Sequence, residues 1–110
     1  MEISEKTIDS KLVLSLKGRL DASSSKELKE RVSAVAKGKN SFLVVDMGDV
    51  DFIDSSGLGS LVSCLRSVNK QGGDIRISSL KDPVRAIFEL TRLHHIFEIF
   101  DNSDDALKSI

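Results

Sequence analysis

The chain has few features that could stabilise it other than side-chain packing. Among its 110 residues there is one cysteine, so no disulfide can form within it, and one cysteine with two histidines is too few ligands for a structural zinc site. Tryptophan and tyrosine are absent and phenylalanine occurs five times, which leaves few of the surfaces that stack on single-stranded nucleic acid. The sequence therefore predicts a fold held by its aliphatic core, with no metal and no cofactor.

The chain also lacks an excess of charge of either sign. Lysine and arginine total 16 and aspartate and glutamate total 17, for a net charge of −1. A chain this balanced has no overall field that would attract nucleic acid or anionic lipid, so we expect neither partner. No stretch approaches the ~20 apolar residues that span a bilayer, and residues 1–5 lack the basic and apolar regions of a signal peptide. We expect a soluble, cytoplasmic protein.

No repeat, low-complexity segment or linker divides the sequence. Its one proline is Pro83, and its seven glycines are scattered. Because a compact domain typically has roughly 100–150 residues, we expect residues 1–110 to form a single domain. We also expect a monomer.

The first part of the chain predicts a β-hairpin. Leucines alternate with other residues along residues 11–17, a period of two that is typical of a strand with one buried face. A second β-like run, residues 3–8, precedes it and is separated from it by Asp9 and Ser10. We expect the two runs to pair as antiparallel strands.

A first helix is predicted after the hairpin. Ser24 and Glu27 have the spacing of a capping box, in which a serine side chain satisfies a free N–H group of the first helical turn. Apolar residues then recur at helical spacing to about Lys37, and Gly38 is a suitable terminator. The sequence therefore predicts an amphipathic helix capped by Ser24.

The rest of the chain alternates strands with helices. Residues 42–45 are a continuous apolar run, typical of a central strand covered on both faces, and residues 46–53 are expected to lead outward to a surface loop. The other predicted elements are a helix over residues 55–71, a strand over 74–78, a helix begun by Asp82 as N-cap and Pro83, a strand over 96–100 and a helix over 103–110. This order predicts an α/β fold with a mostly parallel sheet of four or five strands, an N-terminal β-hairpin and helices packed against it, the two central helices on one face.

One segment, residues 49–60, is more polar and richer in glycine than its position requires. It joins the expected central strand to the second helix, where free N–H groups and the positive helix end converge. In a purely structural interpretation Ser55 caps the helix, Ser56 fills its first turn, and Gly57 and Gly59 allow close packing. Glycine costs roughly 1 kcal/mol relative to alanine inside a helix, however, and two serines beside an aspartate exceed what capping needs. A hydroxyl exposed there is also a favourable place for a phosphate.

This segment also carries a family resemblance. The run Asp54-Ser55-Ser56-Gly57-Leu58-Gly59 resembles the signature of the STAS domain, the anti-sigma factor antagonist family. Residues 18–21 resemble the family's G-x-L-D turn, residues 44–47 its central strand, residues 71–73 its helix end and residues 83–88 its third helix. The similarity extends over nearly the whole chain and implies a small STAS-type fold.

The resemblance implies a switch based on serine phosphorylation. In this bacterial family a partner that is both anti-sigma factor and serine kinase, of the histidine-kinase-like ATPase type, phosphorylates a serine of the D-S-[S/T]-G motif. A serine phosphatase reverses the modification. Carried over to this sequence, the phosphoacceptor is Ser55. The unphosphorylated form is then expected to bind the anti-sigma factor and release its sigma factor, and phosphorylation to abolish that binding.

The partner is expected to contact the polar and small residues around the phosphoacceptor. Small side chains let the backbone of another protein approach closely, and a kinase needs such access to the hydroxyl. The predicted partner-binding residues are Asp21, Ser23, Ser24, Asp54, Ser55, Ser56, Gly57, Gly59 and Ser60.

Two other functions remain open, and enzymatic activity is not expected. The protein could regulate a kinase–phosphatase switch with a target other than a sigma factor, in a stress complex or in secretion, or it could bind a nucleotide weakly. A nucleophile elbow needs a glycine two residues before its serine, but Asp54 is two residues before Ser56. No glycine-rich loop carries the lysine of a phosphate-binding P-loop.

Other reactive side chains receive structural interpretations. His94 and His95 are neighbours whose side chains are expected to diverge, so a shared metal ion is not expected. Cys64 lies near the edge of an apolar stripe and is expected to be an inert, small hydrophobic residue. The aspartates within residues 101–105 lack the glycine and final glutamate of a calcium loop, and stabilisation of a helix start explains them.

Overall fold

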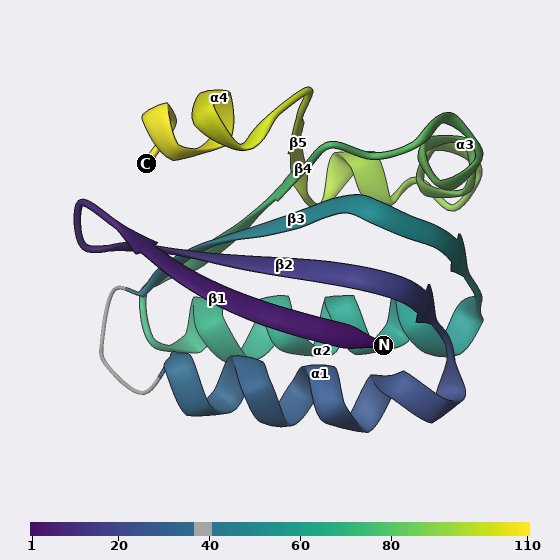
Figure 1. The fold of residues 1–110 in the computed structure, drawn as a ribbon, viewed down its shortest axis with the longest axis horizontal. Helices are drawn as coiled ribbons and strands as arrows, with labels where there is room; N and C mark the ends of the chain where they lie inside the picture. The colour runs from purple at the N-terminus through teal and green to yellow at the C-terminus, as the bar shows by residue number, and fades with distance from the viewer. Residues whose placement is uncertain (37–40) are drawn as a thin grey trace.

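A computed structural model describes residues 1–36 and 41–110. In this part of the chain five strands form one sheet, in the order β1-β2-β3-β4-β5 (Figure 1). The strands are β1 (Glu2–Ile8), β2 (Lys11–Leu20), β3 (Phe42–Ile53), β4 (Asp74–Ser78) and β5 (Glu98–Phe100). The helices are α1 (Ala22–Val35), α2 (Ser55–Lys70), α3 (Asp82–Leu90) and α4 (Ser103–Lys108), with a short 3-10 helix η1 (Leu93–His95).

The pairing of the strands confirms the predicted α/β fold. β1 and β2 are antiparallel and form the expected hairpin, and all other neighbouring strands are parallel. Consecutive parallel strands need a crossover connection, which α1, α2 and α3 supply. Lys37 and Gly38, where the first helix was expected to end, lie outside the described residues.

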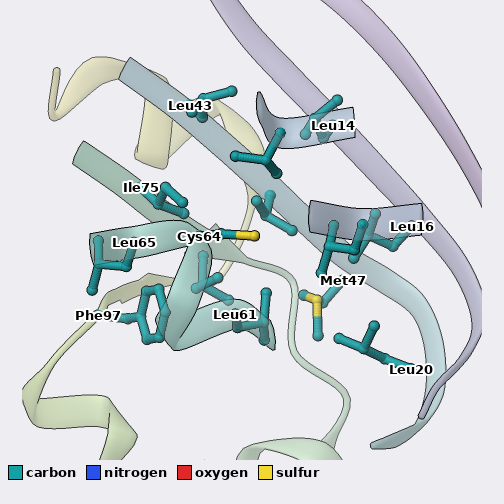
Figure 2. Close-up of a cluster of buried hydrophobic side chains, with 14 of the residues drawn as sticks. Leu14, Leu16, Leu20, Leu43, Met47, Leu61, Cys64, Leu65, Ile75 and Phe97 are labelled. Atoms are coloured by element: carbon teal, nitrogen blue, oxygen red, sulfur yellow. The ribbon is translucent and has the colours of Figure 1, made fainter. Parts of the chain in front are cut away.

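The larger core lies between the sheet and the pair α1 and α2, which lie side by side along one face (Figure 1). This placement of the two central helices is the predicted one. Side chains of β2 and β3 point into this core toward α2, as Leu16, Leu43 and Met47 do in Figure 2. The buried members from β2, β3, α1 and α2 are Leu14, Leu16, Leu20, Leu43, Val45, Met47, Val50, Ile53, Leu28, Val32, Leu61, Cys64, Leu65 and Val68.

The opposite face of the sheet is covered by α4. Val13 and Val44 pack there against Ala106 and Leu107, while the neighbours of Val44 in β3 point into the larger core. Val44 is fully buried, with 0% of its surface exposed. The prediction that residues 42–45 form a central strand covered on both faces is therefore confirmed.

Residues 46–53, which were expected to lead outward to a surface loop, instead belong to the strand itself. β3 continues to Ile53, because β2 also extends further than expected and pairs with it as far as Leu20 opposite Ile53. Val50 and Ile53 are buried, so hydrophobic packing stabilises the extension. β2 and β3 therefore end side by side, and this brings the residues that follow each strand to the same edge of the sheet.

The first residues of α1 also differ from the prediction. The N-cap is Asp21, whose carboxylate accepts a hydrogen bond from the Ser23 N–H at 3.0 Å. Ser24 is the third helical residue, and its hydroxyl accepts a hydrogen bond from the Asp21 N–H at 3.0 Å. The capping box is thus Asp21 with Ser24, and Glu27 takes no part in it. The earlier start follows from β2, which delivers Asp21 in extended conformation directly before the helix.

Two further boundaries differ in the second half of the chain. Lys81, not Asp82, is the N-cap of α3, and Asp82 lies with Pro83 in the first turn, where its charge suits the helix dipole. β5 begins at Glu98 rather than at residue 96, because the preceding residues close η1: the Phe97 N–H donates to the Leu93 carbonyl at 2.9 Å.

The histidine side chains do not diverge as expected. The ring centroids of His94 and His95 lie 4.1 Å apart, and Nδ1 of His94 lies 3.3 Å from the Phe88 carbonyl oxygen, a contact that orients this ring. Within residues 1–36 and 41–110, no group of three or more His, Cys, Asp or Glu side chains could hold a metal ion. No described helix has the length and apolar character needed to cross a bilayer.

Candidate functional site

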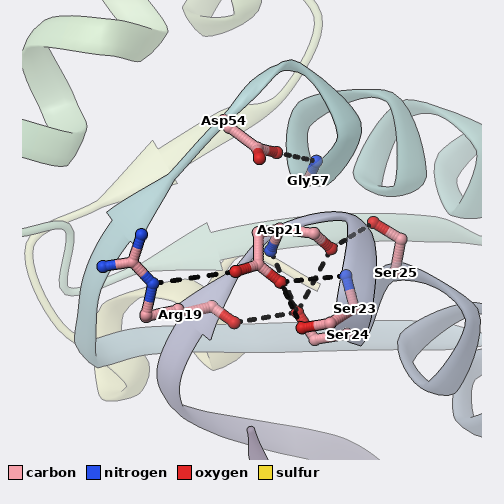
Figure 3. A network of polar contacts seen from close by, with 7 residues as sticks. All are labelled: Arg19, Asp21, Ser23, Ser24, Ser25, Asp54 and Gly57. Atoms are coloured by element: carbon pink, nitrogen blue, oxygen red, sulfur yellow. Dashed lines mark hydrogen bonds and ion pairs between the residues drawn. The ribbon is translucent and has the colours of Figure 1, made fainter.

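The candidate site lies where β2 and β3 end and α1 and α2 begin. The Asp54 N–H donates to the Leu20 carbonyl at 3.3 Å, which joins the end of one strand to the residue after the other. Gly57, in the first turn of α2, packs directly against the backbone of Leu20. These contacts hold the Asp21 and Asp54 turns next to each other, as Figure 3 shows.

Asp54 is the N-cap of α2, and the expectation that Ser55 caps this helix is wrong. The Asp54 carboxylate accepts a hydrogen bond from the Gly57 N–H at 2.9 Å. A carboxylate satisfies this free donor and also interacts favourably with the positive helix end, so it takes the capping position. Ser55 is the first helical residue; it is exposed, and its hydroxyl has no hydrogen-bond partner in the described part of the chain.

Asp21 is the centre of a second set of polar contacts (Figure 3). Its carboxylate accepts from the Ser23 hydroxyl at 2.6 Å and lies 3.6 Å from Nε of Arg19. The hydrogen bond from the Ser23 hydroxyl has the largest effect and lowers the pKa of this carboxyl. Burial has the next largest effect and raises the pKa, and the Ser23 N–H and Arg19 lower it further. The site therefore holds an ionised carboxylate below the pH at which aspartate ordinarily gains a proton.

The structure adds Arg19, Phe52 and Ser25, which sequence reasoning did not include among the site residues. The Arg19 guanidinium lies over the Phe52 ring, with Cζ 3.8 Å from the ring centroid. The Ser25 hydroxyl donates to the Asp21 carbonyl at 2.7 Å and to the Ser56 carbonyl at 3.1 Å, which ties α1 to α2. Arg19 lies in the G-x-L-D turn, which was identified in the sequence. Its contact with Phe52 could not be predicted from the sequence, because it depends on the β2–β3 register that places the two residues opposite each other.

The predicted partner-binding residues lie together, but not all of them face solvent. Ser23, Ser55, Ser56 and Gly59 are exposed, Asp21 and Asp54 are half-buried, and Ser24, Gly57 and Ser60 are buried. The Ser60 hydroxyl donates to the Gly57 carbonyl at 2.7 Å. The three buried residues thus shape the backbone of the site, and the exposed residues form the surface that another protein could reach.

A groove between α1 and α2 begins at this site. Its volume is about 680 Å³, and its lining residues are Ala22, Ser25 and Lys29 from α1 and Ser56, Gly59, Ser60, Val62, Ser63 and Arg66 from α2. A Cβ atom at Gly59 would meet nothing within 4 Å, so the groove is open to solvent at this position.

The family of the chain follows from this fold and motif. The STAS domain model matches residues 2–106, so the chain belongs to the STAS domain family. The Anti-sigma F factor antagonist of Paenibacillus polymyxa is 27% identical over 90% of this chain and 86% of its own length.

Solved structures share the fold. The crystal structure of an anti-sigma factor antagonist from Mycobacterium paratuberculosis is 26% identical, has a TM-score of 0.88, and covers 99% of this chain and 92% of its own. The Bacillus cell fate determinant SpoIIAA in the phosphorylated form is 17% identical, with a TM-score of 0.75 and 98% of each chain covered. At that identity SpoIIAA is similar in fold alone.

Proposed function

We propose that this protein is an anti-sigma factor antagonist of a partner-switching pathway, with Ser55 as its phosphoacceptor. The observation that carries the proposal concerns the cap of α2. Asp54, and not Ser55, caps this helix, so the exposed Ser55 hydroxyl has no hydrogen-bond partner among the described residues. The unphosphorylated form binds an anti-sigma factor that is also a serine kinase, and this frees the sigma factor. A serine phosphatase restores the binding form.

The helix end supports the proposal because it accommodates a phosphate. Ser55 is the first residue of α2, where the helix dipole and free N–H groups stabilise negative charge. Its hydroxyl makes no capping hydrogen bond that modification would break. We therefore expect phosphorylation to leave the fold intact.

An interface around Ser55 would not accommodate the same group. A phosphate carries about −1.5 to −2 charges and would have to lose water next to the carboxylate of Asp54. Like charges brought together in an interface cost several kcal/mol, and roughly 3–4 kcal/mol weakens binding by about two to three orders of magnitude. The modification can thus switch binding without refolding the protein.

The surface around the hydroxyl also suits close contact with another protein. Ser56 and Gly59 are exposed in the first turns of α2, and Ser23 is exposed at the start of α1, with side chains that are small or absent. We propose that residues 1–110 act as one binding module in the cytoplasm, without catalysis of their own.

Phosphorylation by the cognate anti-sigma factor kinase with ATP and magnesium tests this function, with the modified residue located by mass spectrometry. We expect phosphate on Ser55, none on the Ser55→Ala variant, and wild-type modification of the matched control Ser56→Ala. Calorimetry should show that Ser55→Ala binds the kinase constitutively. Ser55→Asp should lose only part of the affinity, because it carries one charge and fewer acceptor oxygens. Phosphate on Ser56, with Ser55→Ala still fully modified, would contradict the assignment.

A further inference from the structure

The groove between α1 and α2 extends along the two helices beyond the serine site. A second hollow of about 160 Å³ adjoins the first and shares Lys29 and Ser63 with it. Its lining residues are Lys29, Val32, Ser33, Ser63, Cys64 and Ser67. The combined hollow, here called the α1–α2 groove, runs from Ser56 toward the C-terminal ends of both helices.

The only charged residues that line the α1–α2 groove in the described part of the chain are two cations, Lys29 and Arg66. Both are exposed, and neither has an ion pair with the described residues. The charge of Lys29 is felt inside the groove, at Cys64. Burial raises the pKa of the Cys64 thiol, and the Lys29 ammonium lowers it by a smaller amount. Among the described residues, the lining of the groove is therefore positively charged and includes no carboxylate.

The walls of the groove leave both cations accessible to a partner. Ser25, Ser63 and Gly59 present small side chains or none, and the space at Gly59 is open. The hydrogen bond from Ser25 to the Ser56 carbonyl, 3.1 Å long, fixes the spacing of the two helices at the end nearest the site. A segment of another protein can thus lie along the open groove over α1 and α2.

The charges of this surface are also ordered along it. Asp21 and Asp54 lie at the starts of α1 and α2, and Lys29 and Arg66 lie further along the same helices. Complementary charge across an interface fixes the register of two proteins and steers their encounter, and like charge excludes wrong registers. The position of the two cations along the groove therefore favours a partner that presents acidic residues to it.

We propose that the α1–α2 groove binds an acidic segment of the partner protein, whose carboxylates pair with Lys29 and Arg66. The identity of the partner rests on the proposed function, but the preference of the groove for an acidic peptide does not. This surface adds a contact that is independent of the phosphoacceptor and sets the orientation in which the partner meets Ser55.

A peptide titration followed by amide chemical shifts tests the groove alone. The probes are a short peptide of alternating glutamate and alanine and its lysine–alanine counterpart. We expect the acidic peptide to shift amides of Ser25, Lys29, Ser63 and Arg66, with an affinity that falls as sodium chloride is added, and the basic peptide to shift none of them. Shifts elsewhere, or equal binding of the two peptides, would overturn the proposal.

Charge-removing variants locate the contact. Since one exposed ion pair contributes about 0.2–1 kcal/mol, Lys29→Ala and Arg66→Ala should each weaken binding of the acidic peptide by up to about fivefold. The double variant should lose more affinity than either single variant, up to about thirtyfold. The matched control is Lys70→Ala, which removes a cation from the end of α2 outside the groove and should bind as the parent does. Circular dichroism melting verifies that the variants fold, and unchanged binding by the double variant would overturn the proposal.

The same variants, tested on the cognate kinase, separate this proposal from the proposed function. We expect the double variant to bind the kinase up to about thirtyfold more weakly, mainly through slower association, while Ser55 can still be phosphorylated at high kinase concentration. If the parent protein binds no anti-sigma factor, the proposed function fails. The peptide titration alone then tests whether the α1–α2 groove binds an acidic segment. If the parent and the double variant bind the kinase equally, the groove proposal fails and the proposed function stands.

Discussion

Gly57 of α2 packs against the carbonyl group of Leu20 so closely that a Cβ atom at position 57 would overlap the Leu20 oxygen. Gly59 is in the opposite situation, because a Cβ atom there would meet nothing within 4 Å. The sequence interpretation gave both glycines the same role in close packing. It is confirmed for Gly57 and wrong for Gly59, which faces the α1–α2 groove instead of β2.

Alanine substitutions at these two glycines should have opposite effects on stability. Gly57→Ala forces α2 away from β2 and should destabilise the protein by about 1–3 kcal/mol. Gly59→Ala gains helix propensity without a clash and should stabilise it by up to about 1 kcal/mol. Urea denaturation monitored by circular dichroism measures both. Equal effects of the two variants would show that the contact with Leu20 does not constrain α2.

Gly59→Arg tests the partner surface without disturbing the fold. A long side chain at this open position projects from the first turns of α2 beside Ser55 and Ser56, and it should abolish binding of the kinase partner in a pull-down or by calorimetry. The far-ultraviolet dichroism should stay unchanged. Asn69→Arg introduces the same side chain near the far end of α2 and should bind as the parent does. If Gly59→Arg bound equally well, the interface would lie elsewhere.

Val44→Asp tests the central position of β3. The new carboxylate would be buried between the sheet and α4 without a partner, which should cost several kcal/mol, a large share of the stability of a domain this small. Thermal unfolding should show a greatly lowered midpoint or no cooperative transition. Thr7→Asp places the same group on exposed β1 and should change the midpoint little. A Val44→Asp protein that melted with the parent would refute burial on both faces.

The Asp21 carboxyl should titrate below its ordinary pKa of 3.8, because Ser23 and Arg19 stabilise its ionised form. A pKa lowered on folding adds stability above pH 3.8, and this stability disappears as the pH falls through the lowered value. Carbon NMR of the carboxyl group measures the midpoint directly. Ser23→Ala removes the largest cause and should move the midpoint up toward 3.8. An unchanged midpoint in this variant would contradict the assigned cause.

The Cys64 thiol should be unreactive in the native protein. Burial raises its pKa to about 11, so almost no thiolate exists near neutral pH, and the side chain itself is only 4% exposed. Alkylation by iodoacetamide at neutral pH should be slow for the folded protein and fast in denaturant. Mass spectrometry follows the modification, and rapid alkylation of the folded protein would contradict the buried placement.

Much of the fold could be predicted because its signals are local. Alternating leucines in β2 and the unbroken apolar run at the start of β3 each indicate a strand within a few residues, and both predictions are confirmed. The ends of these strands were predicted less well. The pairing of Leu20 with Ile53 lengthens both strands, and it depends on a register between segments that are distant in the sequence.

The candidate site was likewise predicted where its signals are local and missed where they depend on distant residues. The hydroxyl and carboxylate side chains and the glycines of residues 54–60 indicate a special turn from the sequence alone. Which residue caps each helix was predicted incorrectly, since Asp21, Asp54 and the serines are all good caps, and the choice follows from where β2 and β3 end.

The sequence by itself determined the class of fold, the order of the elements and the motif that marks the start of α2, because periodicity and composition act over neighbouring residues. Only the tertiary structure decided that Asp54 caps α2 and leaves the Ser55 hydroxyl without a role in capping. It also decided that Gly57 and not Gly59 packs on Leu20, and which cations line the same groove. Lys29 and Arg66 belong to separate helices, and their common surface arises from the packing of α1 on α2. Contacts of this kind are set by the hydrophobic core beneath them, so no local pattern encodes them.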